Sequence, residues 1–264
     1  MNVSLYGGFA KTSFRGMAIY RSAYWLGLVA QWLSYGVTFI TLFIVVDNFN
    51  VLGGWKSEEV LFLYAMNLLS YALAALFFFG PCTGLSGKIR SGEFDAALTK
   101  PVSPLVHEML NGFNPGYVSH ITLSVAVMVV AVRRLHVAFN FPFVLTLLAM
   151  LFGAALVQAA LLVFASAWAF FFINGNPFMG MIWSFKSFIN YPIPIYPVVI
   201  QILLTFLPLA FMNYYPSAIL LNRTENMLFP PLLGYLTPLV GITAFVLSVA
   251  FWNFALSRYQ STGT

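Results

Sequence analysis

Long runs without charged residues dominate this sequence. Asp, Glu, Lys and Arg are absent from residues 22–46, 60–87, 109–132, 135–185, 187–222 and 226–257. An ionised side chain at the centre of a bilayer is costly, and a helix needs roughly 20 mainly apolar residues to cross the hydrocarbon. The runs are therefore typical of membrane-spanning helices, and each is long enough for at least one crossing.

This pattern predicts six transmembrane helices in one domain that covers residues 1–264. The fourth helix should stop near Ile173 and give way to an interfacial, partly amphipathic stretch, because Lys186 follows together with Pro177, Pro192, Pro194 and Pro197. The predicted spans are about 22–46, 60–80, 112–132, 141–173, 198–213 and 233–257. A β-barrel would need alternating polar and apolar positions, whereas these runs are apolar on all sides. We therefore expect an all-α integral membrane protein.

Composition agrees with that prediction. Only 7% of the residues are charged and the mean hydropathy is +0.88, whereas soluble domains are about 25% charged. The single cysteine, Cys82, leaves no internal disulfide, and no Cys/His cluster indicates a metal site. The net charge of +5 comes from scattered basic residues, which form no patch with base-stacking aromatics, so nucleic acid is not expected as a partner.

Basic residues predict the orientation, because cytoplasmic loops carry an excess of Lys and Arg. With the N-terminus inside, the inner segments hold Lys11, Arg15, Arg21, Lys88, Arg90, Lys100, Lys186 and Arg258. The outer segments then hold Lys56, Arg133, Arg134 and Arg223. This excess predicts a multi-pass protein of the inner or plasma membrane with both termini in the cytoplasm, although the Arg133-Arg134 pair opposes it.

Residues 1–21 mix basic and aromatic side chains before the first predicted span. Lys11 and Arg15 are four residues apart and Phe14 lies between them. Such a mixture favours a helix in the membrane interface, with its basic groups at anionic headgroups. The alternative is a solvated N-terminal tail.

The longest polar interruption is residues 80–116, which hold six of the nineteen charges. Gly84, Gly87 and Gly92 should break the second span, so we predict a cytoplasmic loop over 81–111. Glu93 and Asp95 fit the first turn of a short helix, where the helix dipole favours carboxylates. Ile89, Phe94 and Leu98 would give this helix an apolar edge, and Pro101 would end it. The element is either a docking helix or an inert helix on the membrane surface.

A third irregularity lies in and after the fifth predicted span. Prolines and polar aromatics gather there at Pro208, Asn213, Tyr214, Tyr215 and Pro216. Proline removes a backbone donor and ends or kinks a helix. We expect the span to end near Asn213 and residues 216–230 to fold as short re-entrant or interfacial pieces on the outer side. The alternative is a kinked fifth helix followed by a plain loop.

The sequence offers little catalytic chemistry. It contains no G-x-x-x-x-G-K-[ST] phosphate loop, so ATP is not expected to bind this chain in that way. The predicted spans hold no acidic or basic residue, which favours an apolar or amphipathic substrate moved by an external energy source. A membrane-embedded lipid-modifying enzyme is an alternative, and its candidate residues would be His107 and Glu108. A non-transporting membrane scaffold is another.

One stretch resembles a known family. Residues Ile89-Arg90-Ser91-Gly92-Glu93-Phe94-Asp95, followed by Leu98, Lys100-Pro101-Val102 and Pro104, are similar to the loop between spans two and three of permease subunits of type 2 ABC exporters. The similarity is to the bacterial six-span branch, in which arginine is more common at the position of Lys100. The prolines and tyrosines of 191–197 and 208–216 resemble that branch too.

The resemblance implies a permease that pairs with a second permease, identical or homologous, and with two cytoplasmic ATPase subunits that carry ATP and Mg²⁺. No cofactor is then expected on this chain, and membrane lipids surround it. The coupling helix would lie within 85–100, and its implied ATPase-coupling residues are Ile89, Arg90, Gly92, Glu93, Phe94, Asp95, Leu98, Lys100 and Pro101. The N-terminal helix would be a connecting helix, and the region after Pro216 an outer re-entrant gate. Substrates of such exporters include drugs, lipids, polysaccharides and peptides.

Overall fold

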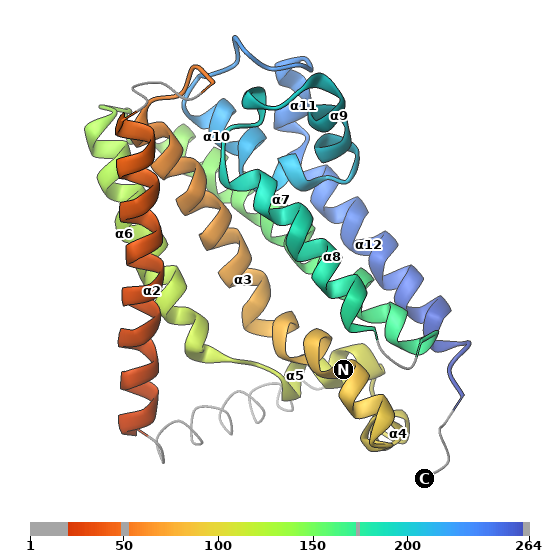
Figure 1. Ribbon diagram of the computed structural model, residues 1–264. Coiled ribbons are helices and arrows are strands. Elements are labelled where there is room, and N and C mark those ends of the chain that lie inside the picture. The colour runs from red at the N-terminus through yellow and green to blue at the C-terminus, as the bar shows by residue number, and fades with distance from the viewer. Residues whose placement is uncertain (1–20, 49–52, 173–174, 261–264) are drawn as a thin grey trace.

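The computed structural model describes residues 21–48, 53–172 and 175–260, and every regular element in these ranges is a helix (Figure 1). The α-helices are α2 (Arg21–Asn48), α3 (Ser57–Arg90), α4 (Glu93–Leu98), α5 (Pro104–Asn111), α6 (Val118–Arg134), α7 (Phe141–Ala167), α8 (Asn176–Ser187), α9 (Val198–Phe206), α10 (Tyr214–Leu220), α11 (Pro231–Tyr235) and α12 (Thr237–Leu256). Short 3-10 helices are η1 (Pro115–Tyr117), η2 (Trp168–Phe170), η3 (Phe188–Asn190), η4 (Ile193–Ile195) and η5 (Leu209–Met212). The all-helical prediction is confirmed for the described residues.

Within the described residues, four helices are long and apolar enough to cross a membrane. They are Ser57–Arg90, Pro115–Arg134, Phe141–Phe170 and Thr237–Leu256. They fall on the second, third, fourth and sixth predicted spans. Helix α2 lies on the first predicted span, and its 28 residues correspond to about 42 Å at 1.5 Å per residue. The chain is therefore a multi-pass membrane protein.

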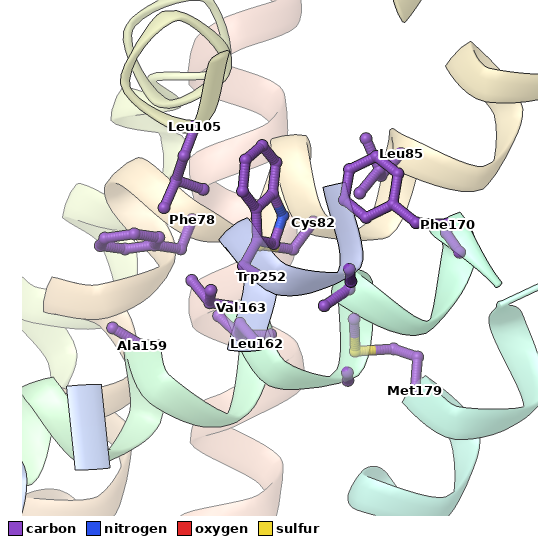
Figure 2. Close-up of a cluster of buried hydrophobic side chains, with 14 of the residues drawn as sticks. Phe78, Cys82, Leu85, Leu105, Ala159, Leu162, Val163, Phe170, Met179 and Trp252 are labelled. Atoms are coloured by element: carbon purple, nitrogen blue, oxygen red, sulfur yellow. The ribbon is translucent and has the colours of Figure 1, made fainter. Parts of the chain in front are cut away.

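Helix α3 contacts α2 and α6 on one side and α7 on the other, and α7 packs closely on α12. Figure 1 shows the long helices side by side, with α4 and α5 at one end of the molecule and α9, α10 and α11 at the opposite end. We call these the α4 end and the α10 end. A buried core near the α4 end joins five helices: Figure 2 shows Phe78, Leu105, Val163, Met179 and Trp252 converging there from α3, α5, α7, α8 and α12.

Helix α3 continues farther than the sequence predicted. It passes through Pro81, Gly84 and Gly87 to Arg90, so the predicted end of the second span near residue 80 is wrong. A glycine inside a helix costs only about 1 kcal/mol, and burial of the apolar side chains of this last part, such as Ile89, offsets that cost. The helix stops at Gly92, whose φ of +73° suits glycine.

The fifth predicted span, 198–213, is not one helix. Helix α9 has nine residues, or about 14 Å, which is too short for a hydrocarbon core of about 30 Å. After it come η5 and the seven-residue α10. The single fifth span predicted at 198–213 is therefore wrong, because three short pieces occupy residues 198–220. The re-entrant or interfacial role predicted for 216–230 stays a prediction.

Helix α8 instead runs along α3, so the interfacial stretch predicted after Ile173 is wrong. The backbone N–H of Gly175 donates to Ser86 Oγ at 3.2 Å near the α4 end. Farther along, Lys186 lies over the ring of Tyr71, and at η3 the Ile189 carbonyl accepts from Asn213 Nδ2. Proline does not prevent this helix, because Pro177 occupies its first turn, where no backbone donor is needed.

Helices α7 and α12 touch through their backbones. A Cβ added to Gly241 would clash with the carbonyl of Gly153, and a Cβ on Gly153 would lie 2.5 Å from the carbonyl oxygen of Thr237. Small residues permit such close crossings of membrane helices, where dispersion contacts replace the hydrophobic effect.

We therefore expect Gly241→Ala to destabilise the protein by about 1–3 kcal/mol through overpacking. Its matched control is Gly36→Ala on α2, because a Cβ there meets nothing within 4 Å and better helix propensity should stabilise by about 0.5–1 kcal/mol. Thermal unfolding in detergent measures both. Equal shifts for the two variants would contradict the close crossing.

Candidate functional site

The resemblance directs attention to the chain between the end of α3 and α5, residues 88–108, which we call the α4 segment. Glu93 and Asp95 lie in the first turn of α4, as predicted, where carboxylates interact favourably with the helix dipole. Ser103 precedes α5, and Pro104 occupies its first turn. The predicted short helix flanked by Gly92 and Pro101 is therefore present, and a second short helix follows it.

Phe94 anchors α4 to the body of the protein. Its side chain has no exposed surface, and its ring centroid lies 5.3 Å from that of Phe170, 6.4 Å from Trp252 and 5.6 Å from Tyr259. Phe170 and Trp252 belong to the core in Figure 2. Leu98, by contrast, is 42% exposed. The predicted apolar edge of Ile89, Phe94 and Leu98 is therefore divided, because Ile89 and Phe94 are buried in the core and Leu98 is exposed.

A hydrogen bond joins α4 to the chain just after α12. Tyr259 Oη donates to Asp95 Oδ1 at 2.9 Å. Partial burial, and secondarily the adjacent Asp95 carboxylate, raise the pKa of the Tyr259 hydroxyl above its ordinary value. The hydroxyl therefore remains a donor at neutral pH, and the C-terminal end of the bundle is tied to α4.

An ion pair joins α3 to α5. Lys88 Nζ lies 2.7 Å from Glu108 Oε2, and the Glu108 side chain is only 6% exposed. A weaker contact of 3.9 Å links Lys88 to Glu93. His107 Nδ1 is 3.8 Å from the second oxygen of Glu108, and Asn111 Nδ2 lies 3.0 Å from the same ring nitrogen. Both residues proposed for the enzyme alternative are therefore engaged in contacts that hold α5.

These contacts divide the predicted coupling residues into two groups. Ile89 and Phe94 are buried, and Gly92 and Asp95 are partly buried. The exposed members form the outer face of the α4 segment: Arg90, Glu93, Leu98, Lys100 and Pro101. This face carries charges of both signs around an exposed leucine, and the buried members attach it to the core.

The predicted gate residues gather at the α10 end. The whole stretch from Leu209 to Leu220 is buried. Tyr215 Oη is 3.0 Å from Thr205 Oγ1 of α9, and the Tyr214 ring lies 5.8 Å from that of Trp55. Pro208 precedes η5, and Pro216 lies inside α10. The short helices thus form a packed cap over the bundle, and their role as a gate stays a prediction.

Two further points concern residues outside these sites. Lys11, Phe14 and Arg15 of the predicted interfacial helix lie outside the described residues. In the described ranges, no group of three or more His, Cys, Asp or Glu side chains is arranged to hold a metal ion.

Sequence reasoning missed a cavity of about 230 Å³ between α2, α3 and α8. It is lined by Tyr35, Tyr64, Asn67, Leu68, Tyr71, Trp183, Lys186, Ser187 and Asn190. Lys186 belongs to the twelve-residue α8, but its Nζ lies over the ring of Tyr71, in the middle part of the spanning helix α3. The predicted spans did not include this lysine. A signal was present in the sequence, because Lys186 is the one charged residue between Arg134 and Arg223.

Comparison with protein families adds a decisive observation. Residues 32–263 match the family model described as ABC-2 family transporter protein. The chain belongs to the ABC-2 transporter family. No curated protein and no solved structure matched it.

Membership in the ABC-2 family confirms the resemblance based on the α4 segment and the tyrosine-proline strings. It makes the chain a membrane permease of a transport system and not, in itself, a catalytic enzyme. ABC-2 permeases generally work with ATPase subunits. The matched region contains the described helices from most of α2 to α12.

The ion pair of the α4 segment predicts a matched pair of variants. Lys88→Met should destabilise the protein by about 1.5–3 kcal/mol, because the buried Glu108 carboxylate loses a charged partner. Lys100→Met removes an exposed lysine instead and should change the stability by less than about 0.5 kcal/mol. Thermal unfolding in detergent measures the difference.

Adding Glu108→Gln to Lys88→Met should recover part of the lost stability, since no uncompensated charge then remains. A double variant whose loss equals the sum of the single losses would show that the two side chains do not interact.

Proposed function

We propose that this chain is the transmembrane permease subunit of an ATP-driven exporter. ATPase subunits dock on the outer face of the α4 segment, and the exported compound is apolar or amphipathic, a lipid or a polymer. The observation that carries this proposal is the division of the segment into an exposed charged face and a buried anchor. An inert surface helix needs neither the ion pair to α5 nor the tyrosine bond to Asp95.

The anchor supports a mechanical role. A force on the outer face reaches α7 and α12 through Phe94, whose ring touches Phe170 and Trp252. It reaches α3 and α5 through the Lys88–Glu108 pair. Because packed interiors transmit strain instead of absorbing it, a small movement of α4 would reposition the long helices.

The proposed assembly contains a second permease, identical or homologous, and two ATPase subunits that hold ATP and Mg²⁺. The α4 end faces the cytoplasm, as the excess of basic residues in the predicted inner segments favours. The α10 end then faces outward, and its packed cap would act as the gate. A lipid-modifying enzyme is less well supported, because its candidate residue Glu108 forms an ion pair with Lys88.

Charge reversal on the outer face tests the docking role. Glu93→Lys should reduce substrate-coupled ATP hydrolysis of the co-expressed complex about tenfold, equivalent to about 1.4 kcal/mol, because a repulsive charge would then face the ATPase. The matched control is Glu225→Lys, since Glu225 is also exposed but lies near the α10 end. The control should hydrolyse ATP as the wild type does.

Glu225→Lys should keep the melting temperature of the purified chain, and Glu93→Lys should lose no more than about 1 kcal/mol of stability, because Glu93 is exposed and its contacts with Lys88 and the helix dipole are weak. A tenfold loss of coupled ATP hydrolysis would then report docking and not unfolding. Phe94→Ala would not distinguish docking from folding, because truncation of a buried phenylalanine lowers the stability by about 3–5 kcal/mol. If the Glu93→Lys complex assembles and couples ATP hydrolysis to substrate normally, the docking role is wrong and the α4 segment is an inert surface helix. An inert helix would tolerate the added lysine, because a basic residue is favourable at an anionic membrane surface.

Orientation has its own experiment. In a chain with Cys82 replaced, a cysteine at exposed Ser91 should react with a membrane-impermeant reagent only when it is applied from the cytoplasmic side. A cysteine at exposed Asn226, near the α10 end, should react only from the outside. The reverse pattern would overturn the proposed topology.

A further inference from the structure

The cavity between α2, α3 and α8 contains a partly buried lysine, Lys186, beside the middle part of α3. Tyr71 lies fourteen residues after Ser57, the first residue of α3, which is about 21 Å along a helix with 1.5 Å rise. The remaining nineteen residues to Arg90 add about 28 Å. Lys186 sits over the Tyr71 ring and is therefore far from both ends of a helix long enough to span the membrane.

Lys186 has aromatic neighbours in place of a counter-ion. Its Nζ is 4.3 Å from the ring centroid of Tyr71 and 4.6 Å from that of Trp183. The ring faces attract a cation but do not neutralise it. Ion pairs found among the described residues join Lys88 to Glu93 and Glu108, His107 to Glu108, and Arg223 to Glu59, and Lys186 belongs to none of these. An ionisable residue at such depth is costly and marks a functional site by default.

Several other polar groups of the cavity can donate hydrogen bonds. Tyr35 and Tyr64 contribute hydroxyls, whereas the Ser187 hydroxyl already donates to the Ser184 carbonyl at 2.7 Å. The oxygen of the Asn67 side chain accepts from Gln158 Nε2 at 3.1 Å, which leaves the Asn67 amide nitrogen as a donor. No carboxylate is among the described residues that line the cavity. A cation with hydrogen-bond donors beside it and no acid among these residues suits an anion.

We propose that this cavity binds the anionic group of an amphipathic substrate, a phosphate, sulfate or carboxylate, with Lys186 as its counter-ion. A volume of about 230 Å³ admits a small headgroup, and the apolar part extends beyond the cavity. Lys186 repels a cationic substrate, and a wholly apolar one would leave its charge unpaired. The inference rests on the proposed function in one respect, namely that the molecule bound in the cavity is taken to be the transported substrate.

The test uses the purified full chain in a neutral maltoside detergent, with its melting temperature followed during ligand titration. The probes are dodecyl phosphate, inorganic phosphate and dodecyltrimethylammonium. We expect dodecyl phosphate to raise the melting temperature in a saturable way and the cationic amphiphile to give no saturable rise. Lys186→Met should raise the dodecyl phosphate concentration at half-saturation at least about tenfold, which is the effect of losing one charge-assisted hydrogen bond.

Two companions make the result specific. Lys186→Arg keeps the charge and should retain the affinity to within about threefold, and Lys56→Met makes the same change at an exposed lysine and should bind as the wild type does. Folding of Lys186→Met is expected, because Lys186 is only partly buried and belongs to none of the ion pairs found among the described residues, so its removal leaves no opposite charge unpaired.

The outcomes separate clearly. Lys186-dependent stabilisation by inorganic phosphate at the same concentrations would identify a site for the free anion and support the same chemistry. Equal binding of both amphiphiles, or unchanged affinity in Lys186→Met, would overturn the proposal. Because this assay contains no ATPase, its failure leaves docking on the α4 segment untouched, and normal coupling in Glu93→Lys leaves the anion site untouched.

Discussion

A charge in hydrocarbon needs a partner, and the architecture of this protein depends on how each charge meets that constraint. Most charged residues meet it by position, because they lie at the two ends of the long helices. At the α4 end, the buried Glu108 carboxylate is paired with Lys88, and at the α10 end Arg223 Nε lies 2.7 Å from Glu59 Oε1. These pairs hold the loops to the bundle at both ends. Lys186 is different, because aromatic rings take the place of an opposite charge.

The same constraint explains how much could be predicted from the sequence. Charge-free runs located most of the long helices, because exclusion of charge from the bilayer is a local property of the chain. Helix α8 was missed because a lysine in the sequence is typical of a position at the membrane interface. The rings beside Lys186 belong to Tyr71 of α3 and Trp183 of α8, and the contact with α3 forms only in the folded protein. The continuation of α3 past Gly84 was missed because its stabilisation comes from core contacts, which no local propensity reveals.

The candidate site illustrates a second limit. Its position and its short helix followed from local signals, namely the acidic first turn, Gly92 and Pro101. The burial of Phe94 did not, because its neighbours Phe170, Trp252 and Tyr259 are distant in sequence and meet only in the folded bundle. A motif can therefore indicate where two proteins meet without distinguishing the side chains that touch the partner from those that hold the surface in place.

The glycine crossing of α7 and α12 has a consequence for how the protein can move. Where Gly153 and Gly241 meet, backbone touches backbone, so no flexible side chains separate the two helices there. Shear motion is a small sliding of packed helices, and this contact lacks the side chains whose torsions could adjust to it. We therefore expect α7 and α12 to travel as one rigid unit, with the relative motion of a transport cycle confined to the side of the bundle formed by α2, α3 and α8.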